Sequence, residues 1–117
     1  MRFMMVIFRN GDEYTEFDET ADRAAFDAMG KYNDQLKKAG ILLAMDGLTP
    51  PSMGARLTFS GGKPKITDGP FAESKEVVGG FALMDVKDRD DAIGWTKRFL
   101  DVLGTGTCHL HEVSPTP

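Results

Sequence analysis

The residues best equipped for chemistry lie between Asp68 and Phe81, where the sequence reads DGPFAESKEVVGGF. Pro70 fixes its own φ at about −65° and pushes Gly69 towards an extended or turn conformation, which holds the backbone beside Asp68. A carboxylate held in this way can act as an acid, a base or a polar anchor in a cleft. It can equally bond backbone N–H groups and only shape the turn. The sequence leaves both roles of Asp68 open.

Four polar residues follow the proline turn at successive positions, namely Glu73, Ser74, Lys75 and Glu76. We expect Phe71 to anchor this loop by burial and to line a ligand site. Lys75 can then receive an anionic group of the ligand, with Glu76 on the rim and Glu73 exchanging protons. Solvated surface charges, whose ion pairs stabilise by about 1 kcal/mol or less, are the alternative. Ser74 is not expected to be a nucleophile, because no G-x-S-x-G motif surrounds it.

Two further candidate ligand-binding residues precede the loop. Arg9 ends an apolar run, and a cation in that position often meets a carboxylate or an anionic ligand. Asp46 stands before a glycine, and it either faces Asp68 across a pocket or is a plain turn residue. Both readings of Asp46 stay open at the level of sequence.

The two histidines, His109 and His111, are two positions apart in a segment with β-strand character, so they should share one face. Two histidines without a third matched ligand make a weak metal motif. The sequence also contains no P-loop and no dinucleotide-binding fingerprint. We therefore predict no metal site and no cofactor.

The run DGPFAESKE resembles the signature of the YCII-related family, in its DGPF branch, with Ser74 where that signature takes Thr or Ser. A weaker resemblance covers nearly the whole chain, including the helix that ends in Lys38-Ala39-Gly40. It implies a ferredoxin-like unit that dimerises into an α+β barrel with a pocket in each subunit. Relatives outside this branch carry a histidine in the first helix, where this chain has Met29 nearby, so their acid/base mechanism does not transfer directly.

The same resemblance implies two alternative functions. Some relatives look like enzymes acting on small, often aromatic molecules, which implies a small dimeric enzyme or binder that uses acid/base chemistry at the DGPF loop. Family members are also often encoded beside extracytoplasmic-function sigma factors. That association implies an interaction or regulatory module linked to transcription control, without catalysis.

Composition narrows the class of protein. A chain of 117 residues fits one domain, residues 1–117, and its 41% hydrophobic and 27% charged content is typical of globular proteins. The net charge of −4, with 14 basic residues among 18 acidic ones, disfavours nucleic-acid binding. The single cysteine, Cys108, excludes an intramolecular disulfide. The N-terminal apolar run is too short for a signal peptide or a membrane span, so we expect a cytoplasmic protein without a membrane partner.

Hydrophobic periodicity predicts the order β-α-β, hairpin, β-α-β, which is a ferredoxin-like βαββαβ fold with an inserted β-hairpin. The expected strands cover residues 3–9, 41–45, 81–86 and 107–113, the expected helices residues 20–39 and 88–103, and the expected hairpin residues 56–59 and 65–67. The inward face of the second helix should include Ala92, Trp95, Phe99 and Leu103.

This order predicts an α+β protein with a four-stranded antiparallel sheet and both helices on one face. Strands 3–8 and 81–86 are apolar at consecutive positions, so the second face of the sheet also needs cover. We therefore predict a homodimer that closes an α+β barrel, with an interface of about 2,000 Å² or more. Gly79-Gly80 should either form a bulge or admit a close backbone approach.

Overall fold

The computed structural model describes residues 1–10, 23–49, 53–68 and 76–115. The elements are β1 (Arg2–Asn10), α1 (Arg23–Lys38), β2 (Leu42–Gly47), β3 (Ala55–Ser60), β4 (Lys63–Asp68), β5 (Glu76–Asp85), α2 (Arg89–Leu103) and β6 (Thr107–Glu112). A four-stranded antiparallel sheet has the order β2-β5-β1-β6, and β3 and β4 form a separate two-stranded sheet. The predicted ferredoxin-like α+β fold with an inserted hairpin is confirmed.

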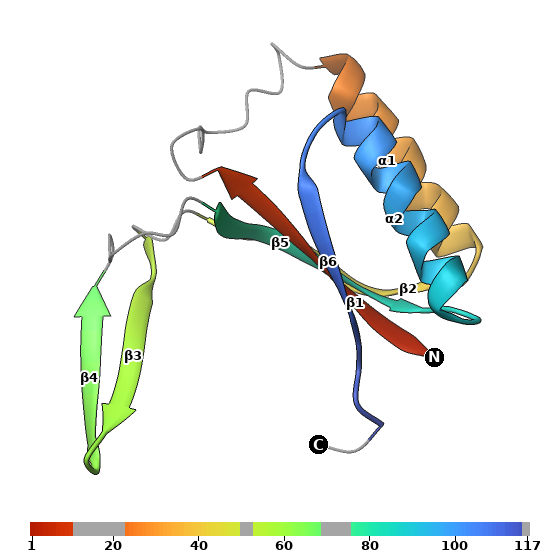
Figure 1. Cartoon of the computed structure of the whole chain (residues 1–117). Coiled ribbons are helices and arrows are strands. Elements are labelled where there is room, and N and C mark those ends of the chain that lie inside the picture. Colours follow the sequence, from red (N-terminus) through yellow and green to blue (C-terminus); the bar gives the residue numbers. More distant parts are fainter. Residues whose placement is uncertain (11–22, 50–52, 69–75, 116–117) are drawn as a thin grey trace.

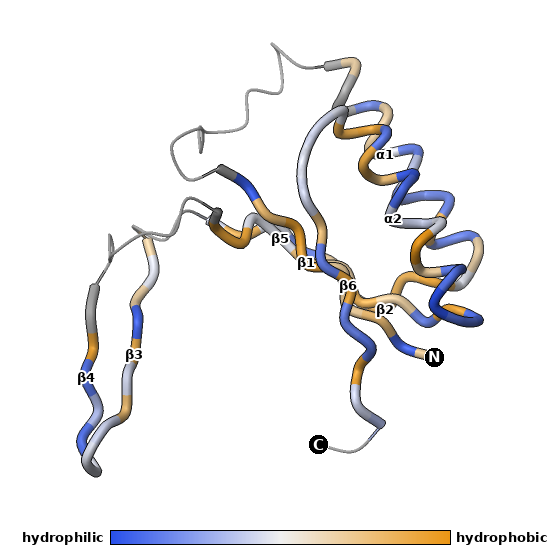
Figure 2. Tube along the Cα trace, in the orientation of Figure 1, coloured by the Kyte–Doolittle hydropathy of each residue, from blue (hydrophilic) through white to orange (hydrophobic). Residues whose placement is uncertain are grey.

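Both helices cover the same face of the four-stranded sheet (Figure 1). β1 and β5 are its central strands, as predicted for β1, and both contain apolar residues (Figure 2). One set of alternate side chains from these strands meets the helices. The buried core consists of Phe3, Met5, Ala82, Met84 and Val86 from the sheet side and Tyr32, Leu36, Ala92 and Phe99 from the helices.

Capping residues mark both ends of the helix α2. Asp88 Oδ1 accepts a hydrogen bond from the Asp91 N–H at 2.8 Å, and Asp91 Oδ2 accepts one from the Lys87 N–H at 3.0 Å. The first bond satisfies a backbone donor that a helix N-terminus otherwise leaves unpaired, and the second ties the residue before the cap to the first turn. The helix ends at Gly104, so both predicted ends are confirmed.

The predicted inward face of α2 is right in part. Ala92 and Phe99 are buried, Trp95 packs against the core, and Thr96 is also buried. Leu103 is 39% exposed, because it is the last helical residue and the chain turns away after it. No helix among the described residues is long and apolar enough to cross a membrane.

The hairpin of β3 and β4 turns at Gly61 and Gly62, whose φ values are +60° and +79°. Two consecutive positive φ values are the requirement of the tight type I′ turn that joins antiparallel strands, and glycine adopts them without strain. The predicted hairpin is therefore confirmed, with each strand slightly longer than the sequence indicated. In Figure 1 it stands apart from the four-stranded sheet.

Candidate functional site

The candidate site lies at the end of the sheet where β1 finishes and β5 starts. Arg9 pairs with Val77, and Asn10 pairs with Glu76. Because the two strands are antiparallel, the last residues of β1 meet the first residues of β5. The structure thus brings two predicted site residues, Arg9 and Glu76, to one end of the sheet.

Gly79 makes room for Arg9 at this end. The pairing of β1 with β5 shifts between Ile7, opposite Gly80, and Phe8, opposite Val78, so Gly79 is the extra residue of a bulge. A Cβ added at Gly79 would lie 2.7 Å from Cγ and Cδ of Arg9. The Arg9 side chain therefore lies directly across the Gly79 backbone, which only a residue without a side chain allows.

Gly80 makes room for the neighbouring strand β2. A Cβ added at Gly80 would lie 3.0 Å from the main-chain oxygen of Asp46, and the Leu48 N–H donates a 2.9 Å hydrogen bond to the Gly79 carbonyl. Both meanings predicted for the diglycine, a bulge and a close backbone approach, are present. The bulge also explains why β5 begins at Glu76, five residues before the predicted start at Phe81: the strand continues through the glycines.

Asp46 lies away from Arg9. It pairs with Phe81, one position after Met45, which packs against the core on the helix side. Alternation along β2 therefore places the Asp46 side chain on the sheet face that the helices leave open. Ile7 packs against the core on the helix side, and alternation along β1 places Arg9 on the same side as Ile7. The structure therefore does not bring these two predicted ligand-binding side chains together.

The DGPF segment is described at its two ends. Asp68 is the last residue of β4 and pairs with Ala55, and Glu76 is the first residue of β5. Phe71, Glu73 and Lys75 lie outside the described residues. The segment that carries these predicted site residues is therefore joined directly to the strand end at which Arg9 lies.

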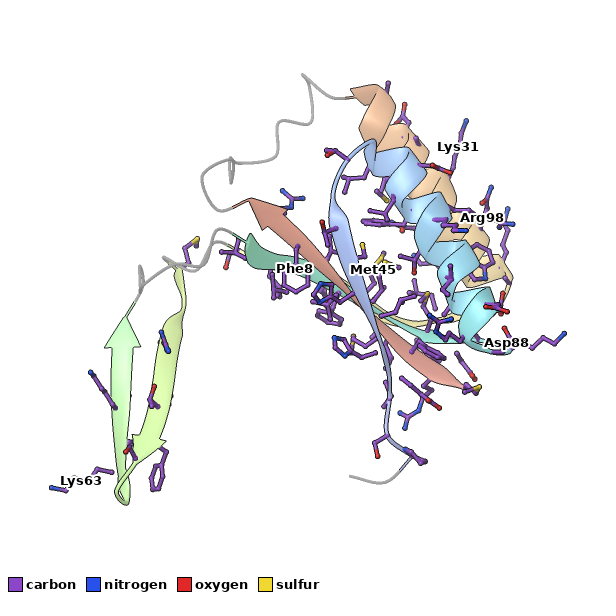
Figure 3. The ribbon with its side chains drawn as sticks, in the orientation of Figure 1. Phe8, Lys31, Met45, Lys63, Asp88 and Arg98 are labelled. Carbon is purple, nitrogen blue, oxygen red and sulfur yellow. The ribbon has the colours of Figure 1, made fainter. Side chains whose placement is uncertain are left out.

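The histidines lie on the face of the sheet that the helices do not cover. His109 pairs with Val6 and His111 with Met4, and the His109 ring lies 4.5 Å from the Phe8 ring between centroids. Figure 3 shows Phe8 on the side of the sheet away from the helices, with Met45 on the helix side. The predicted shared face of the two histidines is confirmed. Among the described residues, no group of three or more His, Cys, Asp or Glu side chains could hold a metal ion.

Two titratable groups lie between the sheet and the helices. Burial is the main reason that the pKa of Tyr32 is raised to about 12; at alkaline pH the thiolate form of Cys108 adds to the rise, and Arg98 opposes it. Burial also raises the pKa of the Cys108 thiol. Tyr32 donates a 3.1 Å hydrogen bond to the Trp95 carbonyl. Both groups are neutral at pH 7, and the Tyr32 hydroxyl joins α1 to α2.

The fold and the motif together define a ferredoxin-like α+β domain in which a bulged central strand follows a DGPF segment in the sequence. The YCII-related domain matches residues 1–104, and the chain belongs to this family. It is also 38% identical over 60 residues to an uncharacterized protein of Rhizobium meliloti (strain 1021), a match that covers 51% of this chain and 48% of that protein. The family resemblance inferred from the sequence is confirmed, and the chain matches about half the length of this relative.

Proposed function

We propose that the protein is a homodimeric binder or enzyme that holds a small, partly aromatic molecule at the end of the sheet beside Arg9 and the DGPF segment. The observation that supports this proposal is the position of Arg9 across Gly79, next to the strand end to which the DGPF segment is joined. A cation placed on a rigid strand is suited to orient an anionic group.

The proposed roles follow from residue chemistry. Arg9 and Lys75 bind the anionic group of the ligand, Phe71 supplies apolar surface and Glu76 lies on the rim. Asp68 and Glu73 exchange protons with the ligand, which requires carboxylates within hydrogen-bond reach of the reacting atoms. Asp46 lies on the other face of the sheet and has no role in this arrangement.

The homodimer is proposed because the second face of the sheet is apolar. Its residues are Met4, Val6 and Phe8 on β1 and Val78, Phe81 and Leu83 on β5, each partly exposed in the single chain. We call this surface the open face. An apolar surface of this extent on a soluble domain is typical of an interface. Pairing with a second copy through a two-fold axis would bury it.

The direct test of the site is substitution of Asp68 by Asn, with Asp101→Asn on the exposed surface of α2 as the matched control. Small aromatic and non-aromatic acids are screened by thermal shift against the wild-type dimer, and each hit is titrated by calorimetry. We expect hits that bind the wild-type and Asp101→Asn proteins but bind the Asp68→Asn protein at least tenfold more weakly. Unchanged binding by a folded Asp68→Asn protein would remove Asp68 from the site.

A further inference from the structure

The hairpin of β3 and β4 has one apolar and one polar face. Leu57 is paired with Ile66, and Phe59 with Pro64, so these four residues share one side of the hairpin. Arg56, Thr58, Ser60, Lys63 and Lys65 occupy the other side by alternation. Leu57, Phe59 and Ile66 are 67%, 72% and 63% exposed. The hairpin is therefore amphipathic, and its apolar side is exposed to solvent.

Within the described part of the chain, β3 and β4 contact chiefly each other. The radius of gyration is 16.2 Å, whereas a compact domain of this length has about 13 Å. The excess agrees with the hairpin standing apart in Figure 1. A lone two-stranded hairpin is at best marginally stable in water, and it becomes stable when an apolar face packs on another element. The apolar side of this hairpin therefore needs cover.

We propose that the hairpin is an arm that packs its apolar side onto a second copy of this chain. The proposal rests on the homodimer of the proposed function, and it goes further because it assigns the hairpin to the interface. In a two-fold dimer each arm contacts the body of the other copy, so the same contact is made twice.

Charge favours a second copy as the partner. Residues 55–68 contain Arg56, Lys63 and Lys65 against the single acid Asp68, a net charge of +2. The rest of a chain whose net charge is −4 therefore carries −6. This excess of acid comes from residues 11–22, which hold six acidic and no basic residues and lie outside the described residues. The described residues outside the arm have a net charge of zero. The attraction between the arm of one copy and another copy is therefore one of net charge, which raises the rate of association.

The area also favours a second copy. Each arm offers Leu57, Phe59 and Ile66, and one aromatic side chain alone can bury roughly 150 Å² or more. Two arms would therefore contribute on the order of 1,000 Å². Added to two open faces, this reaches the size of a stable dimer interface, which lies at about 1,200–2,000 Å² or more.

The first experiment compares two sets of hairpin substitutions by sedimentation equilibrium. The double variant Leu57→Gln/Ile66→Gln removes a cross-strand apolar pair, and Thr58→Gln changes the polar side one position away. We expect the double variant to raise the dimer dissociation constant about thirtyfold or more, and Thr58→Gln to change it less than threefold. All three positions are exposed in the single chain, and circular dichroism checks that each variant is folded.

The second experiment asks which copy the arm contacts. Equal amounts of ¹⁴N- and ¹⁵N-labelled wild-type protein are mixed and treated with a carbodiimide, which joins lysines to nearby carboxylates. We expect mixed-isotope peptides that contain Lys63 or Lys65. If these lysines form cross-links only within one copy, the proposal that the hairpin packs on a second copy is overturned.

The outcomes separate the arm from the dimer itself. A monomeric wild-type protein would overturn both proposals. Suppose that Leu83→Lys on the open face disrupts the dimer but the double hairpin variant leaves its dissociation constant unchanged. That result would overturn the proposal that the hairpin is an arm, and it would support the homodimer. Weakened association of the double variant together with mixed-isotope cross-links supports the arm.

Discussion

At the scale of single residues, the candidate site depends on the absence of a side chain at Gly79. Arg9 crosses β5 where a side chain would stand, so the direction of its guanidinium is set by a neighbouring strand as well as by its own rotamers. Gly80 plays the same part towards the main chain of Asp46. The sequence could indicate a bulge here, because two glycines interrupted an apolar run. It could not indicate which side chain would use the space, since that depends on the register between β1 and β5.

Substitution of Gly79 by Ala should displace Arg9. The new methyl group would lie 2.7 Å from two carbons of the Arg9 side chain, so that side chain or the strand must move. Because the exposed Arg9 side chain can move, we expect a loss of no more than about 1–2 kcal/mol in the free energy of unfolding, together with weaker binding of anionic ligands. Urea unfolding measures the first effect and calorimetric titration the second.

Gly94→Ala is the matched control for this substitution. Gly94 is an exposed position in α2 with no atom within 4 Å of an added Cβ, so alanine should stabilise the protein by about 0.5–1 kcal/mol. Unchanged binding of anionic ligands by a folded Gly79→Ala protein would contradict the part that the contact between Arg9 and β5 plays in the site, because the exposed Arg9 side chain can move aside with little loss of stability.

At the scale of elements, the two helices are joined to each other through Tyr32. Its hydroxyl donates to the Trp95 carbonyl, and its ring contacts those of Trp95 and Phe99 at centroid distances of 6.4 and 5.8 Å. Tyr32 lies within the predicted first helix, and the predicted range of the second helix, residues 88–103, agrees with the observed α2 and its N-cap Asp88. Elements set by local periodicity and capping were thus predictable from sequence. The early start of β5 and the isolation of β3 and β4 were not, because strand pairing between distant segments decides them.

The buried Tyr32 predicts a loss of stability at alkaline pH. Its pKa is about 12 in the folded protein, above the value of about 10 for an unfolded tyrosine. Between these values the unfolded chain releases the proton and the folded chain keeps it, so stability is complete below pH 10 and falls as the pH rises. We expect a decrease of roughly 2–3 kcal/mol by pH 12.

The measurement compares Tyr32→Phe with the Tyr32 protein by denaturant unfolding from pH 8 to 12. Both carry Cys108→Ala, because the raised pKa of Cys108 produces a similar fall that begins at lower pH. Tyr32→Phe should be about 1 kcal/mol less stable near neutral pH, from loss of the hydrogen bond to Trp95, and should have a flatter profile above pH 10. Parallel profiles would show that Tyr32 does not titrate differently in the two states.

At the scale of the whole molecule, the fold has a covered and an uncovered side. The two helices bury one face of the sheet, and the open face keeps apolar side chains on both central strands. Consecutive apolar residues in these strands indicated this from sequence, since a strand with one wet face alternates instead. The chain thus carries more apolar surface than one copy of its own helices can cover.

The last prediction is that Leu83→Lys converts the proposed dimer into a monomer. Leu83 pairs with Met4 on β1 and with Ala44 on β2, so it lies in the middle of the open face. Burying an unpaired ammonium group in an apolar interface costs several kcal/mol, which corresponds to a hundredfold or greater rise in the dissociation constant.

Gln35→Lys, at an exposed position of α1, adds the same charge on the covered side and should leave the dimer intact. Light scattering at micromolar concentration distinguishes the species, and circular dichroism shows whether both variants fold. A compact wild-type monomer, or a dimer broken by Gln35→Lys and kept by Leu83→Lys, would mean that the sheet is not the interface, because a lysine on a surface exposed in both states has almost no effect on association.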